Sequence, residues 1–345
     1  MAPRLRRLLV TGGAGFIGSA FVRQRLRADP EVQITVLDKL TYAGSEENLA
    51  DFAQDPRLRF VRGDICDAGM VDKLAVEADA IVNFAAETHV DRSLLDAGSF
   101  VQTDAYGTYV LLEAARKRRL QRFLQVSTDE VYGHVKEGKS RETDALLPRS
   151  PYSASKAAAE MLVHAYHVSY GVPTVVTRGA NTYGPYQFPE KIVPLFITNA
   201  LQDLPLPVYG SGKAVRDYIY VDDHAEAIAR VLWKGDPGEV YNVGTGAEVS
   251  GVEVADSVLG LCGKPVSLRH FVKDRPGHDY RYSLEASRMR RLGWQPVTSF
   301  HDGLRETVEW YRRHEDWWRK RKAREFWDYY RRNYEGLPAG SFPPP

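Results

Sequence analysis

The sequence predicts an α/β protein built around a doubly wound parallel sheet, with a smaller α/β lobe toward the C-terminus. Two observations support this fold class. Short apolar, β-branched runs alternate with helix-like segments, as in a parallel sheet covered by helices on both faces. Each run also ends in small or polar residues, and ligands bind at the carboxyl edge of such a sheet. The expected strands are residues 8–10, 34–37, 58–61, 80–84, 123–126 and 174–176.

The residues that follow these strands predict where the ligand site lies. They are glycines after the first strand, Asp38 after the second, Asp64 and Ile65 after the third, Ala85 and Ala86 after the fourth, Ser127 and Thr128 after the fifth, and Asn181 after the sixth. Because the carboxyl ends of parallel strands meet at one edge of the sheet, we expect these residues to lie close together.

The composition excludes several classes of partner. The 345 residues carry 46 basic and 45 acidic side chains, so no net field attracts nucleic acid or an anionic membrane. No segment approaches the roughly 18 apolar residues that span a bilayer, and the basic start, Arg4 to Arg7, leads into a strand and not into a signal-peptide core. With only Cys66 and Cys262, a disulfide framework is excluded and a reducing, cytoplasmic location is indicated. The nine histidines lack H-E-x-x-H spacing, so no metal site is expected.

The glycine-rich segment TGGAGFIG, residues 11–18, predicts a dinucleotide-binding turn. Gly12, Gly15 and Gly18 allow a tight turn, close approach of the backbone to a pyrophosphate and close packing of the next helix. Alone, such a pattern also occurs at ordinary strand-to-helix turns. Here a strand precedes it and a helix-compatible run, residues 16–26, follows it, which favours a Rossmann-like nucleotide site.

Asp38 indicates which dinucleotide binds. It follows the second expected strand, 20 residues after Gly18, where a carboxylate accepts the hydroxyl groups of the adenosine ribose. The same carboxylate would repel a 2′-phosphate, so NAD is expected in preference to NADP. Lys39 beside it keeps NADP open as an alternative.

Tyr152 and Lys156 lie four residues apart, so they share one face of a helix. A phenol with a pKa of about 10 is a poor base at neutral pH, and a neighbouring ammonium lowers that pKa by favouring the phenolate. In most helices a tyrosine and a lysine at this spacing have no catalytic role: the tyrosine lies at the edge of the buried face and the lysine lies in solvent. The dinucleotide motif upstream favours a catalytic pair, in which the lysine also holds the nicotinamide ribose.

Five further motifs complete a resemblance to a known family. They are residues 85–93 (AAETHVDRS), 127–133 (STDEVYG), 181–191 (NTYGPYQFPEK), 216–224 (RDYIYVDDH) and 274–279 (DRPGHD). With the glycine and Tyr-Lys motifs, they resemble the extended short-chain dehydrogenase/reductase superfamily from about Arg7 to Tyr311. Within it, the chain is most similar to the nucleotide-sugar 4,6-dehydratases, in particular those acting on dTDP-glucose. Related epimerases and decarboxylases generally lack the adjacent Asp129-Glu130 pair.

This resemblance implies a lyase that converts dTDP-glucose to dTDP-4-keto-6-deoxyglucose and water. Tyr152, assisted by Lys156, takes the C4 hydroxyl proton as hydride passes to tightly bound NAD⁺, and Thr128 hydrogen-bonds the same oxygen. Glu130 then removes the C5 proton, and Asp129 protonates the departing C6 hydroxyl. Hydride then returns to C6 and a proton to C5, which leaves the 4-keto-6-deoxy sugar and regenerates NAD⁺. Two adjacent carboxyl groups in a closed site do not both ionise easily, so one stays protonated. In other contexts, an adjacent acidic pair after a strand usually lies in a turn exposed to solvent.

The expected contacts fall into two sets. The cofactor set is Gly12, Gly15, Phe16, Ile17, Gly18, Asp38, Leu40, Thr41, Asp64, Ile65, Ala85, Ala86, Thr88, Thr103, Tyr152, Lys156 and Thr182. By resemblance, the substrate set is Asn181 at the diphosphate, Lys191 and Arg216 as cations, Pro207 and Tyr209 beside the base, Arg275 and His278 closing the site, and Thr88, Thr128 and Ile192.

Two residues depart from the family pattern. Thr182 stands where the family commonly has a second Asn near the nicotinamide, and Gly251 occupies a position where an Asn contacts phosphate. Neither change removes a proton donor or acceptor of the reaction. Both leave the choice between dTDP-glucose and UDP-glucose open.

The resemblance also implies an organisation for the whole chain. We expect a NAD-binding domain at residues 1–180, to which later segments return, a mainly nucleotide-sugar-binding lobe at 181–335 and a disordered tail at 336–345. Helices expected at 101–116 and 152–170 match those that form a four-helix interface in the superfamily, so a homodimer is expected. Residues 310–334 predict an amphipathic helix on the body, because acidic residues interleave with the basic ones.

Three alternative functions remain. One is a UDP-glucose 4,6-dehydratase, and another is a nucleotide-sugar 4-epimerase or UDP-glucuronate decarboxylase, which oxidises C4 without elimination. The third is a non-catalytic NAD-sensing scaffold, which typically loses the Tyr/Lys pair that this chain keeps. The pathway also stays open, since cell-wall rhamnose and other deoxysugars begin with the same dehydration.

Overall fold

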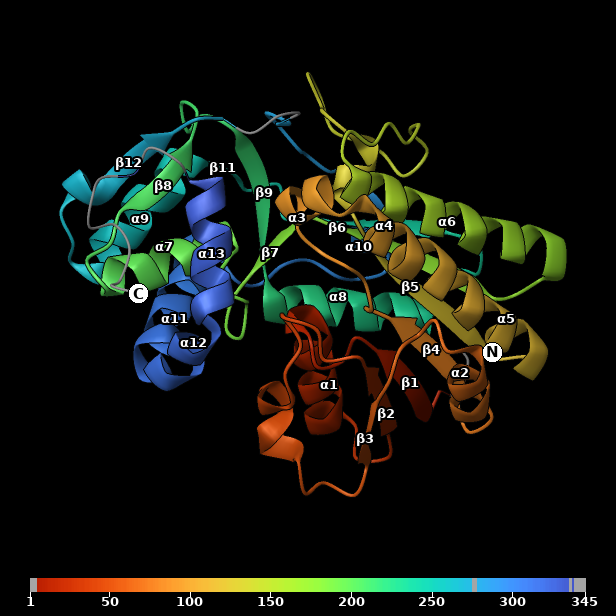
Figure 1. The fold of residues 1–345 in the computed structure, drawn as a ribbon. Coiled ribbons are helices and arrows are strands. Elements are labelled where there is room, and N and C mark those ends of the chain that lie inside the picture. Colours follow the sequence, from red (N-terminus) through yellow and green to blue (C-terminus); the bar gives the residue numbers. More distant parts are fainter. Residues whose placement is uncertain (1–4, 275–277, 335–336, 338–345) are drawn as a thin grey trace.

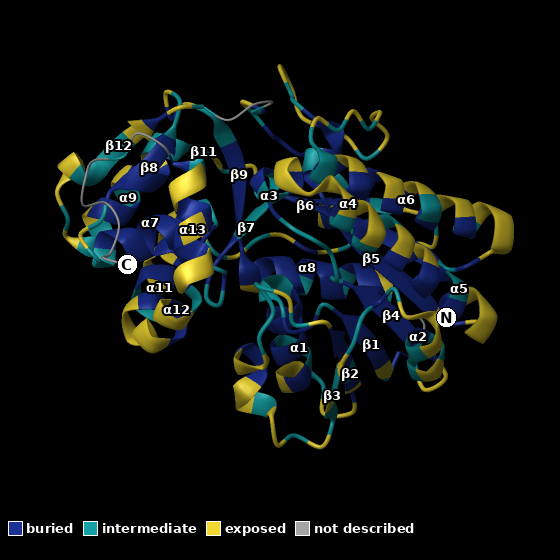
Figure 2. Ribbon diagram, in the orientation of Figure 1, coloured by how far each residue is buried: buried dark blue, intermediate teal, exposed yellow. Residues whose placement is uncertain are grey.

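The structure is a computed structural model that describes residues 5–274, 278–334 and 337. Its larger lobe is a seven-stranded sheet in the order β10-β6-β5-β4-β1-β2-β3 (Figure 1), in which every neighbouring pair is parallel. Figure 2 shows that these strands are mostly buried. The strands are β1 (Arg7–Thr11), β2 (Gln33–Asp38), β3 (Leu58–Arg62), β4 (Ala80–Asn83), β5 (Arg122–Thr128), β6 (Thr174–Gly179) and β10 (Val240–Val243). The predicted fold class is confirmed.

The strand order reverses at β1. The chain adds β2 and β3 on one side of β1 and then returns to place β4 on its other side. In open α/β sheets the crevice at this switch point binds the ligand. The last strand, β10, lies outside the runs predicted from the sequence, because Val240-Tyr-Asn-Val243 is short and carries a polar residue.

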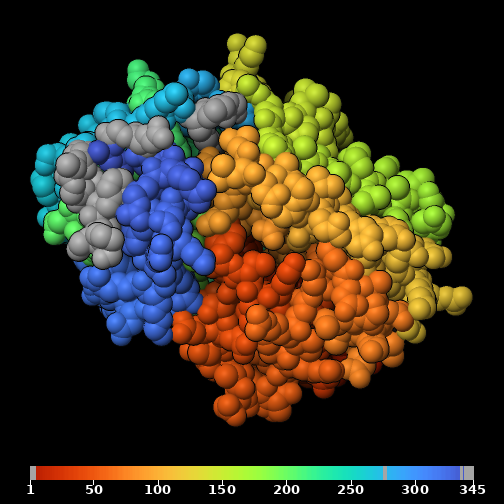
Figure 3. Space-filling model, viewed as in Figure 1, coloured from red at the N-terminus to blue at the C-terminus, as the bar shows by residue number. Residues whose placement is uncertain are grey.

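A smaller lobe is formed mainly by residues beyond 180. It has a three-stranded sheet, β11-β9-β7, and a parallel pair, β12-β8. Its C-terminal helices come back to the N-terminal part of the chain, so blue and red-orange atoms meet in Figure 3. Its elements are β7 (Asn181–Tyr183), α7 (Ile192–Leu201), β8 (Leu206–Tyr209), β9 (Val215–Tyr220), β11 (Glu248–Ser250), α9 (Gly251–Cys262), η4 (Val266–Leu268), β12 (Arg269–Val272), α11 (Phe300–Arg313), α12 (Glu315–Arg321) and α13 (Arg324–Asn333).

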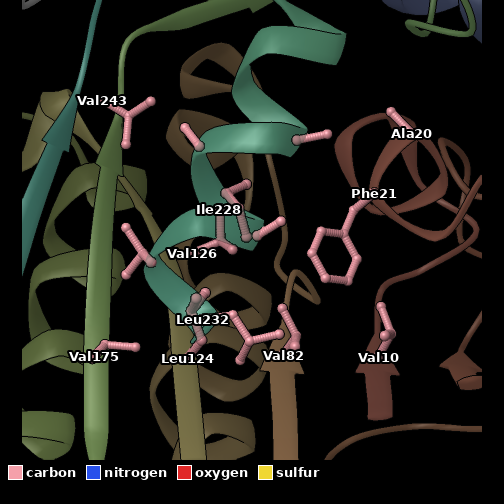
Figure 4. Close-up of a cluster of buried hydrophobic side chains, with 14 of the residues drawn as sticks. Val10, Ala20, Phe21, Val82, Leu124, Val126, Val175, Ile228, Leu232 and Val243 are labelled. Atoms are coloured by element: carbon pink, nitrogen blue, oxygen red, sulfur yellow. The ribbon is translucent and has the colours of Figure 1, made fainter. Parts of the chain in front are cut away.

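Alternation along the strands creates two apolar faces on the large sheet. Leu8 and Val10 of β1 pack with α1 and α8 on one face (Figure 4), whereas Leu9 between them packs with α2, α5 and α6 on the other. Side chains alternate across a strand, so each face needs its own helical layer. The larger-lobe helices are α1 (Phe16–Ala28), η1 (Glu46–Phe52), α2 (Ala68–Ala75), α3 (Val90–Leu95), α4 (Ala97–Phe100), the π-helical turn η2 (Val101–Gly107), α5 (Thr108–Arg118), η3 (Asp129–Tyr132), α6 (Pro151–Tyr170), α8 (Val221–Lys234) and α10 (Ser287–Arg291).

The prediction of one amphipathic helix at 310–334 was wrong. Helix α11 ends at Arg313, and the segment continues as α12 and α13, with breaks at His314 and around Lys322. A single helix of this length would extend about 37 Å and leave part of its apolar face in water. Folding the segment into short helices buries Trp317, Trp318 and the aromatic residues of α13 in the core of the small lobe.

Two sequence predictions lie wholly or mainly outside the described residues. Arg275 is one of them, and the other is the tail at 336–345, of which only Leu337 is described. Among the helices that the structure describes, none is long and apolar enough to cross a bilayer.

Candidate active site

The glycine-rich loop lies against the strand ends at the switch point. Gly12 has a φ of +70°, and a Cβ there would stand 2.5 Å from the backbone nitrogen of Ala85. A Cβ on Gly18 would collide with the carbonyl oxygen of Gly12. Helix α1 then begins at Phe16 without a side-chain cap, so its first backbone N–H groups are available to an anion.

Asp38 ends β2 and faces the same loop. Its Oδ2 accepts a hydrogen bond from the Ala14 amide, and its Oδ1 accepts one from the Leu40 amide, both at 2.9 Å. Burial raises the pKa of this carboxyl, although the two amides favour its charged form. Lys39 forms an ion pair with Asp64 at 2.7 Å, so its charge is already compensated. This arrangement favours a ribose with free hydroxyls over a 2′-phosphate.

A pocket of about 1300 Å³, including its open mouth, runs along this edge of the sheet. All predicted cofactor contacts line it except Leu40 and Thr182. Leu40 lies beside Asp38, with its amide on the carboxylate. The Thr182 hydroxyl lies 2.7 Å from Nδ1 of His224. Three features fit a dinucleotide: a loop in which Gly12 and Gly18 have no room for a Cβ, the uncapped N-terminus of α1, and Asp38.

Ser127 also lines this pocket and is absent from the predicted contacts. Its hydroxyl is buried and has no hydrogen-bond partner within the part of the chain that the structure describes. Buried hydroxyls are normally paired, so this atom is available to a ligand. Its place directly before Thr128 at a strand end is the signal that could have identified it.

Helix α6 positions Tyr152 and Lys156. It starts with a capping box between Ser150 and Ser153 and has Pro151 in its first turn, which fixes where the helix begins. The Tyr152 hydroxyl is in hydrogen-bond contact with the side chain of Thr128.

The expected effect of Lys156 on Tyr152 was wrong for this structure. Burial, followed by the charges of Glu130 and Asp104, raises the pKa of Tyr152 well above its usual value. The Lys156 ammonium donates to the carbonyl oxygen of Val126 at 2.8 Å, and burial lowers its pKa. Desolvation of the buried phenol is the largest cause of the raised pKa, and the charges of nearby carboxyl groups act in the same direction.

The acidic pair follows β5 directly and its two members differ in environment. Asp129 is only 2% exposed, and burial, followed by the charges of Glu130 and Asp217, raises its pKa well above the usual value. Its Oδ2 is buried without a partner among the described residues, whereas Oδ1 lies 3.3 Å from the Thr128 hydroxyl. Glu130 lines a second pocket. Burial thus shifts Asp129 toward its neutral, protonated form, next to a carboxyl group that lines the cavity.

The second pocket lies between the two lobes. The predicted substrate contacts that line it are Asn181, Lys191, Ile192, Pro207, Tyr209, Arg216 and His278. Thr88 lines the first pocket instead, and Thr128 lies beside Asp129 and Tyr152. Gly251 lines the second pocket as well.

Polar groups in the second pocket suit a diphosphate. The Arg216 guanidinium, held by the carbonyl oxygens of Val215 and Asp279 at 2.9 and 2.7 Å, brings positive charge to the pocket. The buried Asn181 Oδ1 is an acceptor without a partner among the residues described, so it is available to a ligand hydroxyl or N–H and not to a phosphate oxygen. Lys191 and Glu190 line both pockets. The two pockets therefore meet where one end of a substrate would approach the cofactor.

Two further carboxyl groups at the site were not predicted from the sequence. Glu190 accepts hydrogen bonds from the Tyr42 hydroxyl at 2.7 Å and from Nε of Arg92 at 2.8 Å. Asp104 accepts one from Ser155 at 2.6 Å, and burial raises its pKa to about 6. Their partners are distant in the chain, so no local pattern indicated them. Within the described residues, no group of His, Cys, Asp and Glu is arranged to hold a metal ion.

Comparisons with known proteins agree with this geometry. The family model described as GDP-mannose 4,6 dehydratase matches residues 9–307. A dTDP-glucose 4,6-dehydratase from Streptomyces niveus is 52% identical over 92% of this chain and 96% of its own. A solved dTDP-glucose 4,6-dehydratase from Streptomyces venezuelae, with NAD and dTDP bound, is 50% identical with a TM-score of 0.90, covering 92% of this chain and all of that one. A Thermus thermophilus UDP-glucose 4-epimerase with NAD is 35% identical with a TM-score of 0.82, covering 89% of this chain and 99% of that one.

Proposed function

This chain belongs to the nucleotide-sugar 4,6-dehydratase family, and from that premise we propose that it converts dTDP-glucose to dTDP-4-keto-6-deoxyglucose and water. It is a NAD-dependent hydro-lyase. The observation that carries the proposal is the acidic pair: Asp129, a buried carboxyl group whose pKa is raised, stands beside Glu130, which lines the substrate pocket. An enzyme that only oxidises and reduces C4 needs neither a second acid nor a second base.

Tyr152 and Thr128 act on the C4 oxygen. When bound, NAD accepts the C4 hydride and later returns it to C6, and the positive charge of its oxidised form opposes the burial that raises the pKa of Tyr152. The phenolate oxygen of Tyr152 takes the C4 hydroxyl proton, and the Thr128 hydroxyl holds the same oxygen in place. Lys156 adds a second positive charge to the site, held against the carbonyl oxygen of Val126.

Glu130 and Asp129 carry out the elimination. Once C4 is a ketone, the C5 hydrogen is acidic, and the Glu130 carboxylate in the substrate pocket takes it. The unpartnered Oδ2 of Asp129 carries the proton that the departing C6 hydroxyl needs. Burial favours the protonated form of Asp129, which suits this residue to act as the acid of the elimination.

The nucleotide preference is tested by incubating the enzyme with dTDP-, UDP-, GDP- and CDP-glucose in parallel. We expect dTDP-glucose to give the strong ultraviolet absorbance in alkali of a 4-keto-6-deoxy sugar, with much slower turnover of the other three. Equal rates with UDP-glucose would overturn the nucleotide assignment. A C4 epimer in place of the keto sugar would support the epimerase alternative, and NAD binding without any turnover would support the scaffold alternative.

We also propose that the protein works as a homodimer in the cytosol. Exposed apolar side chains gather on α3, η2, α5 and α6; the outer faces of these helices appear in Figure 2. They are Leu94, Leu95, Val101, Tyr106, Tyr109, Met161, Val168 and Tyr170, each more than 40% exposed. These helices contact one another, and exposed apolar side chains gathered on neighbouring helices favour an interaction surface. The free thiols of Cys66 and Cys262 suit a reducing compartment.

A double substitution tests the dimer. Tyr106→Glu with Met161→Glu places two charges on this face, and we expect the molar mass measured by light scattering to fall from that of a dimer to that of a monomer. Val297→Glu is the control, because Val297 is apolar and 86% exposed but lies outside these helices. A monomeric wild-type protein, or a double variant that remains dimeric, would contradict the proposal.

A further inference from the structure

Helix α12 of the small lobe contacts the larger lobe directly behind the cofactor loop. The indole Nε1 of Trp317 donates a hydrogen bond to Oδ1 of Asn48 at 3.2 Å, across 269 residues of sequence. Both side chains are buried, with exposed fractions of 8% and 1%.

Asn48 also forms a hydrogen bond with the glycine-rich loop. Its Nδ2 donates to the carbonyl oxygen of Ala14 at 2.8 Å, and the amide of Ala14 donates to Asp38 at 2.9 Å. An indole N–H only donates and a carbonyl oxygen only accepts. The orientation of the Asn48 amide is therefore fixed by its two neighbours, and one series of hydrogen bonds links Trp317 to the carboxylate that faces the adenosine ribose.

Neighbouring contacts hold α12 in this position. Glu47 forms ion pairs with Lys320 and Arg321, both at 3.1 Å. The Arg321 guanidinium lies over the Trp317 ring, 3.8 Å from its centroid, and donates to the Trp317 carbonyl oxygen. Arg23 of α1 donates to the backbone oxygen of Asn48 at 2.7 Å. The end of α12 is thus anchored at Glu47, next to Asn48, while α1 holds the Asn48 backbone in place.

We propose that Trp317 and Asn48 are positioning residues for the cofactor. They hold the Ala14 peptide, and with it the loop between Gly12 and Gly18, in the conformation that binds NAD. The affinity for NAD then depends on a C-terminal helix that lines neither of the two pockets described above. The proposal rests on the cofactor site of the proposed function, but NAD binding is measured without turnover, so the two fail independently.

The decisive test compares Trp317→Phe with Trp318→Phe. Phe keeps a buried ring in each case and removes one indole N–H. Trp318 is the matched control, because its Nε1 donates to the Tyr311 carbonyl within the small lobe at 2.8 Å. Dissociation constants for NAD and for dTDP are measured by calorimetry on protein freed of NAD with charcoal. We expect Trp317→Phe to weaken NAD binding about five- to tenfold and to leave dTDP binding unchanged, and Trp318→Phe to change neither.

A second measurement, amide hydrogen exchange, is made first on the wild-type protein and does not require a change in its affinity for NAD. By linkage, NAD should stabilise α12, so we expect its addition to slow amide hydrogen exchange in Glu315–Arg321 of the wild-type protein. In Trp317→Phe this protection should be lost. Unchanged NAD affinity in Trp317→Phe overturns the proposal, as does an equal weakening of NAD and dTDP binding in both variants, which would indicate a general loss of structure.

Discussion

Replacing Tyr152 by Phe is expected to stop the reaction at its first step. The substitution removes only the hydroxyl that contacts Thr128 and leaves the ring that packs edge-on against Phe100, with centroids 6.2 Å apart. Loss of a positioned general base typically lowers a rate by about 10²–10⁴, or about 3–5 kcal/mol of transition-state stabilisation. We expect NAD to bind normally, with no rise in NADH absorbance at roughly 340 nm, the wavelength of the reduced nicotinamide, when dTDP-glucose is added.

Tyr170→Phe is the control for this variant. Tyr170 lies at the end of the same helix and is 58% exposed, so the same chemical change there should leave turnover at the wild-type rate. If Tyr152→Phe oxidised C4 at an undiminished rate, another group would have to accept the C4 hydroxyl proton, and the role assigned to this tyrosine would be wrong.

Asp129→Asn is expected to separate oxidation from elimination. Because burial raises the pKa of Asp129 and favours its neutral form, Asn matches that form in shape and charge and lacks only the transferable proton. C4 oxidation should therefore proceed, so NADH absorbance appears and persists. Formation of the 4-keto-6-deoxy product should fall by about 10²–10⁴. Undiminished product formation would show that water leaves without this acid.

Glu130→Gln is the matched comparison for Asp129→Asn. Both variants should accumulate the keto intermediate. Glu130→Gln blocks removal of the C5 proton, whereas Asp129→Asn blocks departure of the C6 hydroxyl. In deuterium oxide, Asp129→Asn keeps the base and should exchange the C5 hydrogen of substrate recovered from the enzyme, as seen by mass spectrometry. Glu130→Gln lacks the base and should show no exchange. The reverse pattern would exchange the roles of the two carboxyl groups.

Sequence patterns predicted the parts of the site that depend on neighbouring residues. The continuous apolar run Leu8-Leu9-Val10 predicts a strand buried on both faces of the sheet, and its side chains do pack on both. The spacing of Gly12 and Gly18 predicts a loop in which side chains would collide. Strand ends are local as well, which is why Asp38 and the 127–133 motif could be assigned to one edge of the sheet before their neighbours were known.

Folding of the whole chain decided what no short segment encodes. The direction of the pKa change at Tyr152 follows from desolvation and from carboxyl groups on other elements, and it opposes the expectation from its spacing to Lys156. The sharing of Lys191 by both pockets, and the contact between Trp317 and Asn48, likewise join residues far apart in the chain. The sequence by itself determined the strands, the turns and the chemistry available, since these depend on local geometry. Only the tertiary structure decided the protonation states and the coupling between the lobes. Burial and long-range contacts depend on residues that are far apart in the sequence and are brought together by folding.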